Sequence, residues 1–195
     1  MKKSILLFLL IPTLILSQES FNIKTHNVTN GSKFLQGKIK EIESVLFIDK
    51  IGSAESLYKN ALSWINETYK NPSEVIKAET PFEYIRIEGS TYSLYGISSL
   101  GSLYLYDCRY SIEIRFKDNR FRFEVISFDY YMPTTRYSAG RLVSAELLFR
   151  TENRKGKIKQ DGVRNLSKVK NYLEGLANGL KDHKTNTSDD QYNDW

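Results

Sequence analysis

Two Ser-x-x-Lys sequences come nearest to a catalytic pattern in this chain of 195 residues. Ser56 precedes Lys59 and Ser167 precedes Lys170, so on a helix each hydroxyl would lie one turn from an amine that could act as its base. The companion motifs Ser-Asp-Asn and Lys-Thr-Gly, which give such a pair its catalytic context, do not occur. We therefore interpret both pairs as chance, with serines that cap helices and lysines that face solvent.

Histidine and cysteine supply few further candidates. His26 and His183 are the only histidines and lie in polar flanks, which leaves the expected core without an imidazole base or a typical zinc site. Cys108, the only cysteine, excludes an internal disulfide, and its strand pattern points it into the core, where a neutral thiol is favoured. We predict no catalytic residue, no metal site and no cofactor, because calcium-loop, phosphate-loop and dinucleotide motifs do not occur.

A carboxylate site is an alternative that stays open. Two converging glutamates on the expected sheet would make the protein a small exported hydrolase with an unrecognised carboxylate site. Glutamates are also ordinary on the solvent side of strands, so residue type alone does not decide. The residues concerned are Glu79, Glu83, Glu88 and Glu113.

Residues 1–17 have the three parts of an export signal peptide. Lys2 and Lys3 form the positive beginning, an apolar run covers 5–16, and the expected cut lies ahead of Gln18. A membrane-spanning helix needs about 20 apolar residues, so this run is too short to be one. We therefore expect an exported bacterial protein, periplasmic or extracellular, with no membrane span after cleavage.

The mature chain has the length of one domain. About 175 residues remain after cleavage, which normally bury a single core. The formal net charge of +5 falls by two, to +3, when Lys2 and Lys3 are removed, and acidic and basic residues are well mixed. We expect a flexible segment at 18–41, one domain at 42–181 and a polar, disordered tail at 182–195.

Apolar spacing predicts the elements of that domain. One helix is capped by Ser53 and stopped at Asn71-Pro72. Beyond Val125 the apolar phase moves by one residue to Ile126, which predicts a bulge or a strand end covered on both faces. The expected strands are 42–50, 74–79, 82–90, 104–116 and 121–125, with a tight turn at 117–120 and a second helix at 166–180.

The stretch 131–162 is an expected insertion. Its run 142–149 has the apolar content of either a short helix or a strand, and we assign it as a helix. The polar, glycine-containing run 153–162 is assigned as a loop. The order strand, helix, four strands, insertion and helix predicts an α+β fold, in which an antiparallel sheet of about five strands carries two helices packed on one face.

Several local sequences carry a family resemblance. They are GSAESLY at 52–58, Ala61, Trp64-Ile65, the strand 110–116, its partner 120–129 and the acidic end at Trp195. Together with the element order over roughly 42–180, they resemble a bacterial, exported domain-of-unknown-function family with a TATA-binding-protein-like (TBP-like) fold. The resemblance implies export in Gram-negative bacteria. It implies no activity and no site residues, because none is established for the family.

A fold likened to a DNA-binding saddle raises the question of nucleic acid. Such a partner would require Arg and Lys gathered on the open sheet face. Here the arginines of the expected strands are interleaved with glutamates, which cross-strand charge pairing explains as well. We therefore expect no nucleic-acid partner. The residues are Arg86, Arg109, Arg115 and Arg122, interleaved with Glu88, Glu113 and Glu124.

The remaining hypothesis is a non-enzymatic binding or accessory module of the cell envelope. It would contact an envelope protein or polymer through the sheet face or the insertion, since aromatic and arginine side chains in a loop are common anchors. In an alternative interpretation, the tyrosines finish the last strand and pack under the insertion. The candidate binding residues are Tyr130, Tyr131, Arg136 and Tyr137.

Overall fold

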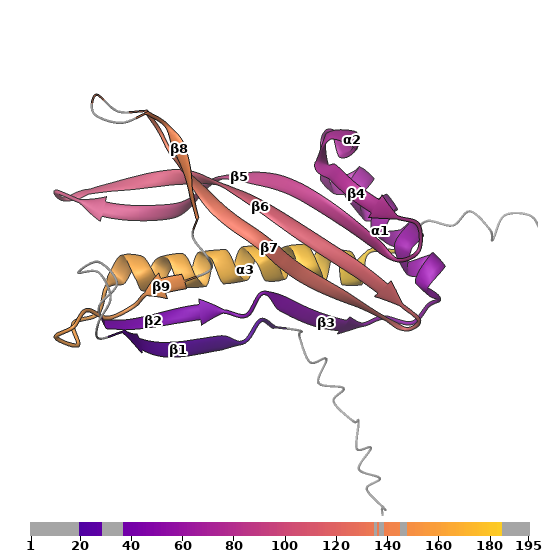
Figure 1. Ribbon diagram of the computed structural model, residues 1–195, viewed down its shortest axis with the longest axis horizontal. Coiled ribbons are helices and arrows are strands. Elements are labelled where there is room, and N and C mark those ends of the chain that lie inside the picture. Colours follow the sequence, from indigo (N-terminus) through magenta and orange to yellow (C-terminus); the bar gives the residue numbers. More distant parts are fainter. Residues whose placement is uncertain (1–19, 29–36, 135, 137–138, 145–147, 185–195) are drawn as a thin grey trace, which may run out of the picture.

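The computed structural model describes residues 20–28, 37–134, 136, 139–144 and 148–184, which form two antiparallel sheets and three helices (Figure 1). The larger sheet contains β3 (Val45–Asp49), β4 (Ile76–Thr80), β5 (Tyr84–Ser99), β6 (Ser102–Lys117), β7 (Arg120–Met132) and β8 (Arg141–Ser144). The smaller sheet contains β1 (Ile23–Val28), β2 (Gly37–Ile42) and β9 (Leu148–Arg150). The helices are α1 (Ala54–Thr68), α2 (Pro72–Val75) and α3 (Gln160–Asp182).

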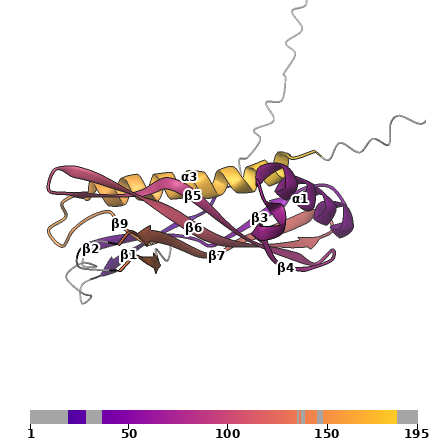
Figure 2. The same ribbon diagram turned by 90° about the horizontal axis from the view of Figure 1, so that it is seen from above.

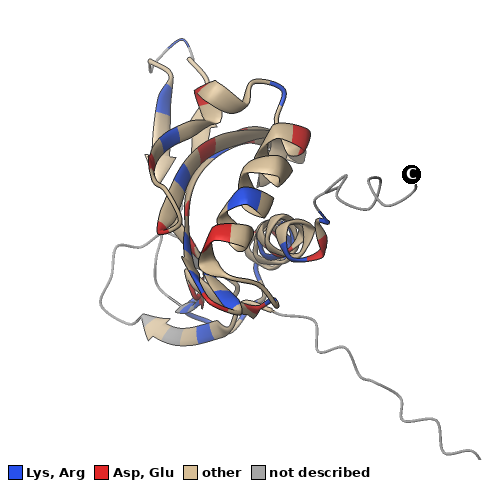
Figure 3. Ribbon diagram, turned by 90° about the vertical axis from the view of Figure 1, so that its right-hand side faces the viewer, with Lys and Arg blue, Asp and Glu red and all other residues tan. Residues whose placement is uncertain are grey.

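The larger sheet curls around the two long helices. Its strand order is β3-β7-β6-β5-β4, and β8 pairs with the far end of β7. Helix α3 runs along the sheet (Figure 2), and the sheet curves around α1 and α3 on one side (Figure 3). We call the side that holds these helices the concave face and the opposite side the convex face. The predicted α+β class is therefore confirmed, with more strands than the five expected.

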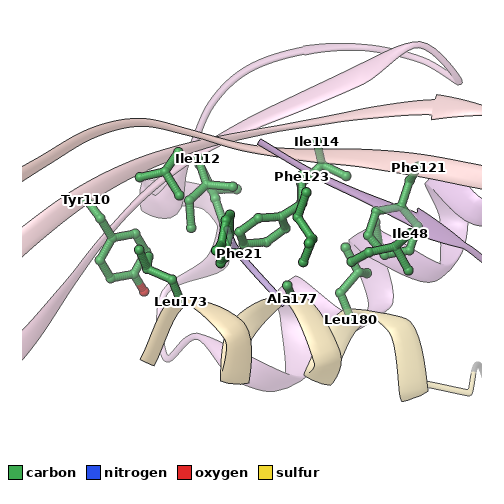
Figure 4. Close-up of a cluster of buried hydrophobic side chains, with 14 of the residues drawn as sticks. Phe21, Ile48, Tyr110, Ile112, Ile114, Phe121, Phe123, Leu173, Ala177 and Leu180 are labelled. Carbon is green, nitrogen blue, oxygen red and sulfur yellow. The ribbon is translucent and has the colours of Figure 1, made fainter. Parts of the chain in front are cut away.

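Strand alternation decides which side chains fill the concave face. On β6, Tyr110, Ile112 and Ile114 share one parity and are buried against α3 and the neighbouring strands (Figure 4). Cys108 has the same parity and is buried, as predicted. Burial raises the pKa of its thiol to about 11, so the sulfur stays neutral near pH 7.

A bulge in β7 explains the shift in apolar phase. Ser111 pairs with Ser127, whereas the next residue, Ile112, pairs with Val125. Ile126 is therefore the extra residue, and its side chain is exposed. The predicted bulge is confirmed, and it allows both halves of β7 to present apolar side chains to the core.

Side chains of α3 cover the part of β5 that extends beyond β4. The Asn165 amide accepts a hydrogen bond from the Gly96 N–H at 2.9 Å and donates one to the Gly96 carbonyl at 2.9 Å. One turn earlier, the Asp161 carboxylate accepts a hydrogen bond from the Ser98 N–H at 2.6 Å. These bonds replace a neighbouring strand, because the backbone groups of an edge strand otherwise stay unpaired.

A buried carboxylate holds the beginning of the described chain on α3. Glu174 accepts hydrogen bonds from the Ser20 hydroxyl at 2.6 Å and the Phe21 N–H at 2.9 Å, and it forms an ion pair with Lys170. Burial raises the pKa of Glu174, but these hydrogen bonds lower it by more, so its pKa lies below the ordinary value. The Phe21 side chain is buried in the core beside Phe123.

The prediction of a flexible segment at 18–41 is wrong for its described residues. They include β1 and β2, which pair with each other, while β2 also pairs with β9 near the other end of the chain. Polar strands of this kind give little local signal, because distant partners stabilise them.

The expected strand 42–50 is divided, since β2 ends at Ile42 and β3 begins at Val45. The predicted signal at 1–17, and 185–195 of the predicted tail, lie outside the described residues.

The expected helix at 142–149 is wrong. Its described residues belong to β8 and β9. Strand β8 extends the sheet along β7, where Leu142 pairs with Tyr131, and β9 extends the smaller sheet along β2. Short apolar runs fit either element, and here the backbone groups of strands already in place select the strand.

The loop expected at 153–162 is shorter than predicted, because α3 begins at Gln160. Gly162 lies in the first turn of α3, against the backbone of β9. A Cβ atom at this position would lie 1.8 Å from the Arg150 carbonyl oxygen. The glycine therefore allows close packing of helix on strand, and it does not mark a loop.

The described residues include no helix with the length and apolar content needed to cross a bilayer.

Asn165→Leu should lower the free energy of unfolding by about 2 kcal/mol, because the buried Gly96 N–H loses its acceptor and the Gly96 carbonyl keeps only the hydrogen bond from Arg164. Asn171→Leu, at an exposed position of the same helix, is the matched control and should change it by less than about 0.5 kcal/mol. Urea unfolding followed by circular dichroism measures both. Equal stability of the two variants would contradict a role for Asn165 in holding β5.

Glu174 should contribute to loss of stability in acid. A carboxyl whose pKa is lowered by folding stabilises the protein above its unfolded pKa, near 4.5, and that contribution disappears as the pH falls through the folded pKa. Glu174→Gln should be about 1–3 kcal/mol less stable than wild type near neutral pH. It should also lose less stability than wild type between about pH 5 and about pH 3.

Urea midpoints measured across that pH range test this prediction. Glu55→Gln, at an exposed position on α1, is the control and should keep the wild-type pH dependence. If the urea midpoint of Glu174→Gln depends on pH as steeply as that of wild type, Glu174 does not carry the effect.

Candidate binding site on the convex face

The convex face carries rows of side chains that run across the strands. One row contains Phe47, Arg122, Arg115 and Tyr84, each opposite the next. The adjacent row contains Val45, Glu124, Glu113 and Arg86. Residues two apart on a strand share a face, so a basic and aromatic row lies beside a row with two glutamates at its centre. Basic and acidic segments accordingly alternate along the sheet (Figure 3).

Glu113 binds the two rows together. Its carboxylate accepts hydrogen bonds from Arg86 Nη2 at 2.6 Å and from Arg115 Nε at 2.6 Å, and the residue is 3% exposed. Burial raises the pKa of Glu113, but the two guanidinium groups lower it by more, so the pKa stays below its ordinary value. Arg115 also lies over the Tyr84 ring, 5.3 Å from its centroid. These contacts fix the direction of the Arg115 side chain.

A hollow of about 490 Å³ opens at the end of the basic row, where β6 turns into β7. The residues that line it are Phe47, Glu83, Arg115, Phe116, Lys117, Arg120 and Arg122. Arg115 and Arg122 each form an ion pair with a glutamate of the adjacent row. Among the described residues, Lys117 and Arg120 have no acidic ion-pair partner. The arrangement is suited to an anion that adjoins an apolar group.

The β6–β7 turn uses its own polar groups to hold the beginning of α1. Asp118 Oδ1 accepts a hydrogen bond from the Ala54 N–H at 2.9 Å, and Asn119 Oδ1 accepts one from the Gly52 N–H at 3.2 Å. An acidic group at a helix N-terminus is favourable, since it satisfies free N–H groups and the helix dipole. The carboxylate of Asp118 is thus engaged with α1 rather than with Lys117.

Tyr130 and Tyr131, two of the four predicted binding residues, are consecutive on β7 and so lie on opposite faces of the sheet. Tyr130 lies on the concave face, stacked on Tyr95 with 4.4 Å between ring centroids, and burial raises its pKa. Tyr131 is the next residue of β7 and is 45% exposed. Arg136 is exposed, and Tyr137 lies outside the described residues. Tyr130 thus packs against a tyrosine of β5, and a binding role for the four candidates stays a prediction.

The Ser-x-x-Lys pairs have structural contacts. The Ser56 hydroxyl donates a hydrogen bond to the carbonyl of the cap residue Ser53 at 3.0 Å, and Lys59 forms an ion pair with the exposed Glu55. In the second pair, Lys170 is bound to Glu174 and is mostly buried, so its expected exposure to solvent is wrong.

The four glutamates considered for a hydrolase lie in different surroundings. Glu79 accepts a hydrogen bond from the Tyr58 hydroxyl at 2.9 Å, Glu88 pairs with Arg109, and Glu83 lines the hollow. In the described part of the chain, every carboxyl group with a resolved pKa shift is shifted downwards, opposite to the shift of a general acid. The hydrolase alternative stays a prediction that no contact of these residues favours.

Sequence reasoning missed the hollow. Phe47 carried a usable signal, since its parity is opposite to that of the buried Leu46 and Ile48 and places an apolar ring on the solvent side. Lys117 and Arg120 were expected only as ends of a turn. Their place beside Phe47 depends on the pairing of β3 with β7, which the local sequence does not state.

Comparisons with known proteins identify the fold. Residues 45–131 match the family described as "Domain of unknown function (DUF4468) with TBP-like fold". The chain is similar to a DUF4468 family protein from Bacteroides ovatus, at 16% identity and a TM-score of 0.52, over 72% of this chain and 86% of the other. It is also similar to a TBP-like protein from Parabacteroides distasonis, at 12% identity and a TM-score of 0.47, over 72% and 92%. No curated protein matches.

The matched range begins at the first residue of β3 and ends one residue before the end of β7, so it contains α1 and the central strands. The resemblance predicted from the sequence is confirmed. Over residues 45–131, this protein is therefore similar to the DUF4468 family, a domain of unknown function with a TBP-like fold.

Proposed function

We propose that this protein is an exported, non-enzymatic binding module of the bacterial cell envelope, and that its convex face binds an anionic envelope component. The observation that carries the proposal is the hollow at the β6–β7 turn, where cationic and aromatic side chains meet on a sheet face that the helices leave uncovered.

The composition of the convex face supports binding. Phe47 is 62% exposed although it lies opposite Arg122, and the bulge residue Ile126 is 48% exposed. Aromatic and arginine side chains contribute much of the energy at protein surfaces that bind partners. An apolar ring exposed between arginines is therefore a suitable anchor.

Charge complementarity supports an anionic partner. Lys117 and Arg120 have no acidic ion-pair partner among the described residues, so an incoming anion would not have to displace one. The acidic row begins only beyond Arg115 and Arg122, where Glu113 and Glu124 are already bound to arginines.

The predicted export signal supports the envelope as the compartment. Lys2 and Lys3, the apolar run 5–16 and the expected cut ahead of Gln18 are the basis of that part of the proposal. Export would bring the convex face into contact with the polymers and lipids of the envelope.

Binding of the mature chain, 18–195, to isolated bacterial envelopes tests the proposal in a sedimentation assay. Arg120→Glu combined with Phe47→Asp should reduce the bound fraction at least about tenfold, because charge attraction becomes repulsion and the apolar anchor is lost. Lys168→Glu, at an exposed position of α3, is the control for added acidic charge and should bind like wild type.

A second variant separates the two candidate surfaces. Tyr131→Ala combined with Arg136→Ala alters the candidate residues near the insertion. If this variant loses binding while the Phe47 and Arg120 variant keeps it, the convex hollow is not the binding surface. If wild type does not sediment with envelopes at any salt concentration, the proposed function is wrong.

A further inference from the structure

Four cationic residues occupy two neighbouring rungs of the β6–β7 hairpin. Arg115 is paired with Arg122, and Lys117 is paired with Arg120. All four share the convex face, because cross-strand partners point the same way and so do residues two apart on a strand. Their positions form a rectangle of about 5 Å across the strands and about 7 Å along them, within which long side chains can meet at one small group.

The nearby acidic residues leave part of this charge unbalanced. Asp118 is hydrogen-bonded to the Ala54 N–H. Asp49 is the cross-strand neighbour of Arg120, but no ion pair joins them in the described structure. Glu83 is the acidic residue among those that line the hollow. Because glutamates of the adjacent row already form ion pairs with Arg115 and Arg122, Lys117 and Arg120 are the two cations of the rectangle that have no ion-pair partner among the described residues.

A phosphate monoester matches two cations that have no ion-pair partner among the described residues. It carries about −1.5 to −2 charges near pH 7 and offers three acceptor oxygens. A carboxylate carries a single negative charge and leaves one cation unbalanced. Arginine also binds phosphate oxygens through two parallel N–H bonds, so Arg120 is suited to this group in geometry as well as charge.

The aromatic side of the hollow indicates what the phosphate is attached to. The Phe47 ring lines the hollow and is largely exposed. An exposed ring beside cations favours a ligand in which an apolar or aromatic group adjoins the anion. The volume of about 490 Å³ is in the range of small-ligand sites.

From this geometry we propose that the hollow binds a phosphate monoester attached to an apolar or aromatic group, with Lys117 and Arg120 on the phosphate and Phe47 on its carrier. The inference rests on the proposed function and names the chemistry that the convex face recognises.

Phenyl phosphate is the probe, and isothermal titration calorimetry of the mature chain at low ionic strength is the measurement, because salt screens exposed charges. Inorganic phosphate and benzoate are the comparison ligands. Phenyl phosphate should bind most tightly. Inorganic phosphate should bind several-fold more weakly because it lacks the ring, and benzoate about tenfold more weakly because it carries less charge.

Variants assign each part of the site. Lys117→Gln and Arg120→Gln should each weaken the binding of phenyl phosphate about tenfold. Glu83→Gln should tighten it about two- to fivefold, because a repelling carboxylate is removed, and a merely unfolded variant would not show this gain. Phe47→Ala should weaken phenyl phosphate but leave inorganic phosphate unchanged. Lys168→Gln is the control and should bind like wild type.

Three outcomes would overturn the inference: benzoate binding as tightly as phenyl phosphate, binding that survives combined Lys117→Gln and Arg120→Gln, or weaker binding in Glu83→Gln. Envelope binding without phenyl phosphate binding would leave the proposed function standing and remove this site. Phenyl phosphate binding without envelope binding would leave this site standing and remove the proposed function.

Discussion

The burial of one sheet face against α3 is the constraint on which the rest of this structure depends. Long antiparallel strands can bury only alternate side chains, so β6 places Tyr110, Ile112 and Ile114 against the helices and sends the residues between them to the opposite face. The bulge at Ile126 preserves this division where the β7 sequence changes phase. Since the helices cover only the concave face, the charged side chains of the convex face must find their partners among one another.

Polar contacts between distant segments complete the core. Asn165 closes the free edge of β5, and Glu174 holds the backbone of Phe21 against α3. Each is a buried polar side chain whose hydrogen bonds replace those of water, which is why such a group is stabilising when paired and costly when its partner is removed. Through these two residues, α3 joins the beginning of the described chain to the free edge of β5.

The candidate site is a consequence of the same layout. The β6–β7 turn is held to α1 by Asp118 and Asn119, so the last rungs of the hairpin have a fixed position. Glu113 is bound to Arg86 of its own row and to Arg115 of the basic row, while Lys117 and Arg120 lie farther along the hairpin, at its turn. The cationic hollow therefore forms at the end of the hairpin, where two cations have no ion-pair partner among the described residues.

The sequence by itself determined the α+β class, the cap of α1 at Ser53, the inward direction of Cys108 and the bulge, because these follow from periods of two or 3.6 residues that are local. Only the tertiary structure decided that 142–149 contributes strands, that Gly162 belongs to a helix and that β1 and β2 pair. It alone also placed Phe47 beside the cations of the hairpin. In each of these cases the deciding contact joins segments far apart in the chain, and a local pattern cannot specify its partner.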